Sequence, residues 1–157
     1  MERSLDQLMP LLEDGQTQAA LQIALQIYAG NPDDALTNYY CAIAYDANSQ
    51  EQQAAPHYER ALAQGLAGAE RRFALLGLGS TYRVLGEHEK SAIILRQGLA
   101  EYDGGREFEV FLALTLYCLG DYAQSMELLL RNLAETSQDI HLQNYQQALL
   151  YYSKHLD

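Results

Sequence analysis

The fold is decided by a stretch that occurs twice, 34 residues apart. The first copy is Leu78-Gly-Ser-Thr-Tyr-Arg-Val-Leu-Gly-Glu-His-Glu-Lys-Ser91, and the second is Leu112-Ala-Leu-Thr-Leu-Tyr-Cys-Leu-Gly-Asp-Tyr-Ala-Gln-Ser125. Leucine, threonine, a Leu-Gly pair, an acidic residue, an aromatic ring and serine recur at matching positions. Residues 41–49 align at a shift of 37, and residues 15–20 align 34 residues further back. The sequence therefore predicts four repeats, with the three extra residues placed in a loop at 65–68.

Each repeat contains two runs of apolar residues at helical spacing. In the third repeat the first run is Phe73, Leu75, Leu76, Leu78, Tyr82 and Leu85, and the second is Ala92, Leu95 and Leu99. Because apolar residues three or four positions apart share one helix face, each run predicts an amphipathic helix. Gly15, Gly86 and Gly120 stand where the first helix should end in a left-handed residue, and Asp121 is a candidate cap for the next helix. An all-α fold is expected.

The pattern of small and large residues resembles the tetratricopeptide repeat family. Ala42, Gly79 and Ala113 fill the small site of the first helix, a tyrosine follows at Tyr45 and Tyr82, and Ala20, Ala54, Ser91 and Ser125 fill the small site of the second helix. This resemblance implies a right-handed α-solenoid of four helix–turn–helix repeats, about 1–34, 35–71, 72–105 and 106–138, in a single domain of residues 1–157. The first repeat departs most from the pattern, because Leu8 occupies its small site and Leu11 its tyrosine site.

The residues after the fourth unit, 139–157, predict one capping helix. Its apolar stripe is Ile140, Tyr145, Leu149 and Tyr152, and its polar side is Gln143, Gln146, Gln147 and Lys154. A stack of helix pairs needs its last apolar face covered, so we expect the apolar stripe to face the stack and the polar side to face solvent.

Charge limits the classes of partner. The chain has 10 basic and 21 acidic residues and a net charge of −11, which disfavours nucleic acid and membrane surfaces. The first residues do not have the basic and apolar regions of an export signal, so a cytoplasmic location is expected. The stretch Leu78-Gly-Ser-Thr-Tyr-Arg83 also resembles small free-standing bacterial members of the family.

No catalytic, cofactor-binding or metal-binding residues are predicted. Gly77-Leu-Gly79 is followed by Tyr82 where a dinucleotide fingerprint needs its third glycine, so the two glycines are interpreted as helix-crossing residues. The four histidines do not form metal-ligand pairs and are expected to be exposed or capping, and the two cysteines are expected to be small buried residues. An enzyme has no support from the sequence.

A protein-binding surface is the remaining candidate. The resemblance implies that the first helix of each pair lines a concave groove, where side chains not needed for stacking face a partner. The predicted groove residues are Tyr39, Ile43, Asp46, Phe73, Leu76, Ser80, Arg83, Val110, Leu114, Tyr117, Asn144 and Tyr151. Members of the family that hold the acidic tail of heat-shock chaperones use lysines and asparagines where this chain has Tyr39, Ile43, Ala47 and Ser80. We therefore expect an apolar ligand, or a basic one with apolar anchors, held by a scaffold or adaptor.

Self-association is the alternative prediction. Leu5, Leu8, Leu11 and Leu12 lie on one side of the first predicted helix, in the unit that matches the repeat pattern least well. If these leucines are exposed, they could join two copies in a homodimer that needs no peptide ligand.

Overall fold

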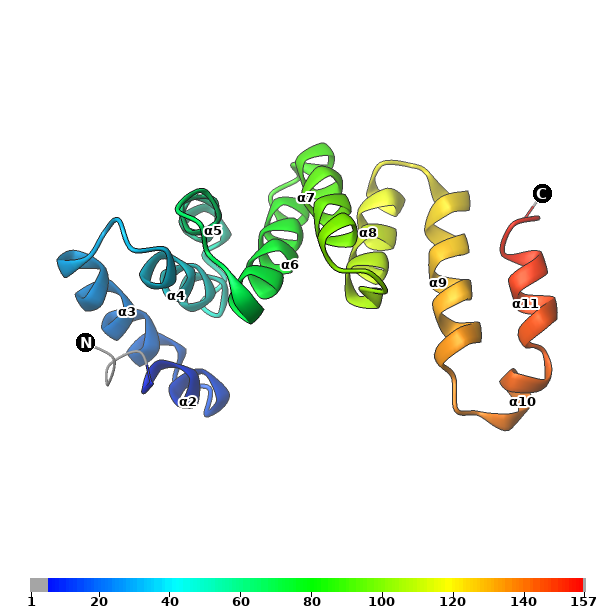
Figure 1. Cartoon of the computed structure of the whole chain (residues 1–157), viewed down its shortest axis with the longest axis horizontal. Helices are drawn as coiled ribbons and strands as arrows, with labels where there is room; N and C mark the ends of the chain where they lie inside the picture. Colours follow the sequence, from blue (N-terminus) through cyan, green and yellow to red (C-terminus); the bar gives the residue numbers. More distant parts are fainter. Residues whose placement is uncertain (1–5, 157) are drawn as a thin grey trace. The chain divides into compact units, whose positions relative to one another are not determined.

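The structure is a computed structural model that describes residues 6–156. Among these residues all the regular elements are helices, shown along the chain in Figure 1. Their bounds are α2 (Leu8–Glu13), α3 (Thr17–Gly30), α4 (Ala35–Asp46), α5 (Glu51–Ala63), α6 (Gly68–Val84), α7 (His88–Glu101), α8 (Arg106–Cys118), α9 (Tyr122–Thr136), α10 (Ile140–Asn144) and α11 (Gln146–Tyr152). The all-α prediction is confirmed.

Each of two compact parts of the chain contains several helices: the first unit ends at Glu87, and the second unit begins at His88. In the first unit each helix from α2 to α6 packs on the next, and α4 also contacts α6. In the second unit α8 packs against both α7 and α9, and α9 packs against α11. Packing between consecutive helices is the arrangement expected of an α-solenoid.

The turn inside each repeat has the same backbone conformation in all four copies. Gly15, Gly86 and Gly120 have φ of 75°, 79° and 83°, and Ser49, at the matching position of the second repeat, has φ of 55°. The amide that follows each of them donates back to the preceding helix, as Glu87 N does to Tyr82 O at 2.8 Å. These are Schellman turns, which need a left-handed residue at that position. The predicted left-handed glycines are confirmed, and Ser49 adopts their conformation without being glycine.

The three extra residues that were expected in the loop at 65–68 lie in a helix and not in a loop. The loops that precede α4, α6 and α8 cover residues 31–34, 64–67 and 102–105, so their lengths are equal. By contrast α6 has 17 residues, while α4 has 12 and α8 has 13. The expected loop insertion is therefore wrong: the insertion extends α6 at its amino-terminal end.

The small sites of the repeat pattern are buried at helix contacts. Ala20, Ala42, Ala54 and Ala113 have no exposed surface, and neither has Ser91. Of the two serines, Ser125 donates from Oγ to Ala113 O at 2.7 Å, while the Ser91 hydroxyl pairs with that of Thr115 at 2.8 Å. Small side chains let the helix axes approach closely, and the serines in addition satisfy buried polar groups.

The leucines of the first helix are mostly part of the core. Leu8 is fully buried with Ala20, Ala24 and Cys41, and Leu11 and Leu12 pack against that cluster. The expectation that these side chains are exposed is therefore wrong for Leu8, while Leu11 and Leu12 are half-buried. Leu5 lies outside the described residues.

The carboxyl-terminal segment differs from the single helix that was expected. It forms two short helices, α10 and α11, which meet at Tyr145. The predicted orientation is wrong for most of the apolar stripe, because Ile140, Tyr145 and Tyr152 are 60%, 66% and 59% exposed, while Leu149 is half-buried. On the predicted polar side Gln143, Gln147 and Lys154 are exposed as expected. Gln146, predicted to face solvent, instead donates from Nε2 to Ala134 O of α9 at 3.1 Å. The amide of Gln146 can satisfy a carbonyl at the end of α9, which an apolar side chain cannot do.

Candidate functional site

The predicted groove residues of the first unit lie on α4 and α6. Of those on α4, Tyr39 is only 7% exposed and its ring packs edge-on against Tyr40, with the centroids 5.4 Å apart. Burial raises the pKa of the Tyr39 phenol to about 12. Tyr39 is therefore a core residue that a partner could reach only at its margin, while Ile43 and Asp46 are half-buried.

The stripe on α6 is more accessible. Phe73 is 60% exposed, and Leu76, Ser80 and Arg83 are half-buried along the same side of the helix. The Nε atom of Arg83 is buried and makes no hydrogen bond. We name these four residues the α6 stripe.

A buried polar network lies beside the α6 stripe. The Asp46 carboxylate of α4 accepts hydrogen bonds from the Thr81 hydroxyl, at 3.1 Å to each oxygen, and from Tyr58 of α5. Desolvation is the main cause that raises the pKa of Asp46 to about 6, and the nearby Glu51 raises it further. Burial and the Asp46 charge raise the pKa of Tyr58 as well. The network ties three helices together around one carboxylate.

Glycine at position 77 makes this network possible. A Cβ atom built on Gly77 would lie 2.6 Å from the Tyr58 hydroxyl oxygen, which is closer than such atoms approach in proteins. This close contact with Tyr58 of α5 supports the interpretation of Gly77 as a residue at a helix crossing.

The predicted groove residues on α8 in the second unit form a more exposed stripe. Leu114 is 39% and Tyr117 is 64% exposed, and Val110 is half-buried. The opposite side of the helix carries Phe108 and Leu112, which are buried. We name Val110, Leu114 and Tyr117 the α8 stripe.

Sequence reasoning missed the residues that extend this stripe. Tyr122 of α9 is 58% exposed, and its ring lies 5.0 Å from that of Tyr117, centroid to centroid. Leu119 and Met126 nearby are 39% and 44% exposed. A signal was present in the sequence, because Tyr122 aligns with His88 at the first position of a second helix, before the apolar residues of that helix begin.

Asn144 and Tyr151 come from the carboxyl-terminal helices. Both are exposed, Tyr151 by 60%. The Tyr151 ring stacks on His155 at 4.3 Å between centroids and also packs edge-on against Tyr152. These residues belong to the second unit, as the α8 stripe does.

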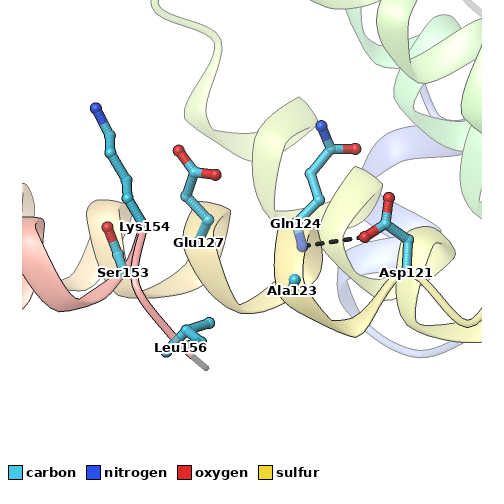
Figure 2. Close-up of a pocket in the computed structure, with 7 residues that line it drawn as sticks. All are labelled: Asp121, Ala123, Gln124, Glu127, Ser153, Lys154 and Leu156. Atoms are coloured by element: carbon cyan, nitrogen blue, oxygen red, sulfur yellow. Dashed lines mark hydrogen bonds between the residues drawn. The ribbon is translucent and has the colours of Figure 1, made fainter.

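Two hollows, one in each unit, are small and polar. One of about 230 Å³ is lined by Asp46, Glu51, Ser80, Thr81 and Val84 of the first unit. Another of about 250 Å³, in the second unit, is drawn in Figure 2. There Glu127 and Lys154 point to the same side while Leu156 points to the other. The Asp121 carboxylate accepts a hydrogen bond from the backbone N–H of Gln124 at 3.2 Å. The predicted cap at Asp121 is confirmed, because its carboxylate caps the amino-terminal end of α9.

Two residue types lie elsewhere than expected. His57 is 9% exposed and pairs through Nδ1 with Asn38 Oδ1, so it is not an exposed or capping histidine. Cys41 is buried as expected, but Cys118, at the end of α8, is exposed.

Within residues 6–156 no group of histidine, cysteine and acidic side chains is placed to hold a metal ion. The helices of this part of the chain are also too short or too polar to cross a membrane.

Comparisons with known proteins agree with this architecture. A solved structure described as a putative kinesin light chain with nearly identical TPR-like repeats, from Podosopora anserina, matches with a TM-score of 0.72 and 21% sequence identity. The match covers 98% of this chain and 85% of that one. A search of curated proteins gives no match. The family model described as "Tetratrico peptide repeat" matches residues 35–156, so it begins where the second repeat begins. The chain belongs to the tetratricopeptide repeat family.

Proposed function

We propose that this chain binds segments of other proteins through the α8 stripe of the second unit, that the α6 stripe of the first unit is a separate contact surface of the same kind, and that the chain acts as a scaffold or adaptor in the cytoplasm. Tetratricopeptide repeats are generally protein–protein interaction modules, which supports a role in binding rather than in catalysis. The contact surface consists of side chains on the first helices of the repeats.

The observation that carries the proposal is the apolar outer side of α8. A helix on the surface of a globular protein normally turns polar side chains to solvent. Here Leu114 and Tyr117 take that place while Leu112 and Leu116 are buried on the other side. A contiguous exposed apolar patch is typical of an interaction site, and tyrosine provides much contact area at a low cost in conformational entropy.

Charge indicates the chemistry of the ligand. The hollow beside the α6 stripe contains the carboxylates of Asp46 and Glu51, and the chain as a whole carries −11. An acidic ligand would be repelled, whereas lysine or arginine side chains would be attracted to this hollow. We therefore propose a ligand with apolar anchors and at least one basic residue.

Selection from a displayed library of random peptides tests the α8 stripe without a known partner. The intact chain should enrich peptides that combine aromatic or aliphatic residues with lysine or arginine. The double variant Leu114→Ser, Tyr117→Ser should lose this enrichment, while Ile93→Ser, which removes a 63% exposed side chain on α7, should keep it. Equal enrichment by the double variant and the control would remove the α8 stripe from the proposal.

The α6 stripe is tested by titrating the selected peptides. Phe73→Ser should weaken binding, and Leu25→Ser on α3 is the control for loss of an exposed apolar side chain in the same unit. Asp46→Asn should weaken binding of peptides with a basic residue more than binding of the same peptides with that residue changed to glutamine. If Asp46→Asn weakens both equally, the carboxylate does not recognise the basic side chain.

A further inference from the structure

An apolar hollow lies between α2 and α3, on helices that the α6 and α8 stripes do not use. Its volume is about 520 Å³, within the range of about 300–1,000 Å³ that is usual for ligand pockets. Unlike the two polar hollows, it is lined mainly by apolar surface, with two exposed carboxylates beside it. The apolar lining comes from Pro10, Leu11, Ala19 and Ile23, and the carboxylates are those of Asp6 and Asp14. We name it the α2–α3 hollow.

The two branched side chains of the α2–α3 hollow occupy positions that another helix covers in the second repeat. Leu11 and Ile23 lie 34 residues before Tyr45 and His57, whose rings stack with their centroids 5.5 Å apart. The ring of Tyr28, from α3, packs edge-on against His57 at 4.9 Å between centroids. In the second repeat, therefore, an aromatic side chain of the preceding helix closes this position.

The third repeat has a contact of the same kind. Tyr82 occupies the position of Leu11 and donates to Oε1 of Glu59, on α5, at 2.5 Å. Since α3 packs on α4 and α5 packs on α6, the second helix of one repeat covers this position of the next repeat. The same positions of α2 and α3 thus form a surface of the kind that receives a helix.

Charge indicates which kind of helix fits this surface. Residues 1–59 contain nine acidic residues and one basic residue, Arg3, so this part of the chain carries −8 of the net charge of −11. Two of these acidic residues, Asp6 and Asp14, line the α2–α3 hollow itself. Such a surface attracts lysine and arginine side chains and repels acidic ones. A second copy of this chain would bring the same negative charge to the contact, so charge favours a basic partner over a second copy.

We infer that the α2–α3 hollow docks a basic amphipathic helix of another protein. One aromatic or aliphatic side chain of that helix enters between Leu11 and Ile23, as Tyr28 packs against His57 in the next repeat. Lysine or arginine side chains of the same helix lie near Asp6 and Asp14. The buried apolar anchor provides most of the affinity, and the charges select the partner and speed its association.

This contact is separate from the proposed α6 and α8 stripes and does not depend on them. The hollow is formed by α2 and α3, whereas the stripes lie on the first helices of the third and fourth repeats. A chain with both kinds of surface can hold two proteins, which is what a scaffold does.

Ala19 offers a variant that fills the α2–α3 hollow and keeps the fold. The matching positions of the later repeats are Gln53, Lys90 and Gln124, each the third residue of its helix, as Ala19 is of α3. The repeat therefore accepts a long polar side chain at this position. Ala19→Gln replaces apolar surface of the hollow by an amide and leaves the charge unchanged. Ala29→Gln, at an exposed position near the other end of α3, is the matched control.

Selection from a displayed library of helical peptides tests the inference. The intact chain should enrich peptides in which one large apolar side chain is flanked by lysine or arginine. Ala19→Gln should bind these peptides at least about tenfold more weakly, with unchanged helical circular dichroism, while Ala29→Gln binds them as the intact chain does. If no enriched peptide distinguishes Ala19→Gln from Ala29→Gln, the hollow is not a docking site.

The same peptides separate this inference from the proposed α8 stripe. The double variant Leu114→Ser, Tyr117→Ser should bind them as tightly as the intact chain does, because the α2–α3 hollow is left complete. Peptides that lose binding to this double variant but not to Ala19→Gln would support the α8 stripe and contradict the inference.

A second pair of double variants tests the part that charge plays. Asp6→Asn with Asp14→Asn should weaken binding of the selected peptides about threefold, because both carboxylates are exposed. Asp33→Asn with Asp103→Asn removes the same charge at exposed positions elsewhere and should weaken binding less. Equal weakening by the two double variants would show that the hollow does not recognise basic side chains.

Two other occupants of the α2–α3 hollow have results of their own. In sedimentation velocity over a concentration series the intact chain should remain a monomer, and a dimer that Ala19→Gln splits would assign the hollow to a second copy. Peptide binding that appears only in Leu5→Ser would assign the hollow to the first residues of the chain itself. Either result would overturn the inference.

Discussion

Nδ1 of His57 lies 2.9 Å from Oδ1 of Asn38, and both side chains are buried. Asn38 donates from Nδ2 to the carbonyl oxygens of Pro32 and Asp34, at 2.8 and 3.0 Å. Its Oδ1 is therefore an acceptor, and His57 must donate to it from Nδ1. The contact joins α5 to α4 and to the turn that begins the second repeat.

Replacing His57 should show how much this buried pair contributes. His57→Leu leaves Asn38 Oδ1 without a donor, and an unpaired buried acceptor costs about 1–3 kcal/mol. His57→Asn places an amide nitrogen close to the position of Nδ1 and should recover part of the loss. Urea unfolding of the three proteins measures the difference, and equal losses in both variants would show that packing, not the hydrogen bond, matters at this position.

Acidification should destabilise the fold through the same histidine. Burial, with a further contribution from Arg60, lowers the pKa of His57 from its ordinary value of 6.5. The unfolded chain then binds a proton at a higher pH than the folded one does, so stability is lost as the pH falls below about 6.5. Between pH 7 and pH 5.5 the free energy of unfolding should fall more steeply for the intact chain than for His57→Asn. Parallel slopes would assign the pH dependence to other groups.

Asp46 should have the opposite dependence on pH. Its pKa is about 6 in the fold and 3.8 in an unperturbed chain, so the folded state keeps the proton longer. Stability is consequently lost as the pH rises from about 4 to 6, and the full cost remains at pH 7. Asp46→Asn should raise the free energy of unfolding at pH 7 by on the order of 1 kcal/mol, reduced by partial solvation, and should gain little at pH 4. A variant less stable than the intact chain at both pH values would show that the carboxylate is needed by Thr81 and Tyr58.

Gly77 should not tolerate a side chain. Gly77→Ala places a methyl group against the Tyr58 hydroxyl and would displace it from Asp46, because the distance to a built Cβ is only 2.6 Å. Overpacking of a core costs about 1–3 kcal/mol. Gly30→Ala at the end of α3, where a Cβ would meet nothing within 4 Å, is the matched control and should be close to neutral. Thermal unfolding of the two variants compares them directly.

The local features of the fold could be predicted from the sequence. Gly86 and Gly120 ended helices as expected, because a left-handed turn is a property of the few residues that form it. The expected place of the insertion is wrong, since α6 begins at Gly68, a left-handed glycine with φ of 67° that both forms the turn and starts the helix. A glycine can start a helix as well as interrupt one.

Exposure could not be predicted equally well. Tyr39 and Val110 occupy the same position of the repeat, yet Tyr39 is 7% exposed and Val110 is half-buried. The neighbouring helices and the ring of Tyr40 determine burial, and these are tertiary contacts that a repeat pattern does not contain. The same limit explains the reversed face of α11, where the amide of Gln146 bonds to the end of α9 and the tyrosines turn outward.

Ser49 offers a site at which the chain can be stabilised. It has φ of 55° at the position where the other three repeats have glycine, and a non-glycine residue in this conformation costs about 1 kcal/mol or more. Ser49→Gly keeps the backbone bonds of Ser49 N to Asp46 O at 2.9 Å and of Gln50 N to Tyr45 O at 3.0 Å. Part of the gain is offset by the greater freedom of glycine in the unfolded chain, so we expect a net stabilisation of about 0.5 kcal/mol. Gly86→Ser, the reverse exchange in the third repeat, should destabilise by a similar amount. If urea unfolding shows both exchanges to be neutral, the left-handed turn does not select glycine in this protein, and the recurrence of Gly15, Gly86 and Gly120 needs another explanation.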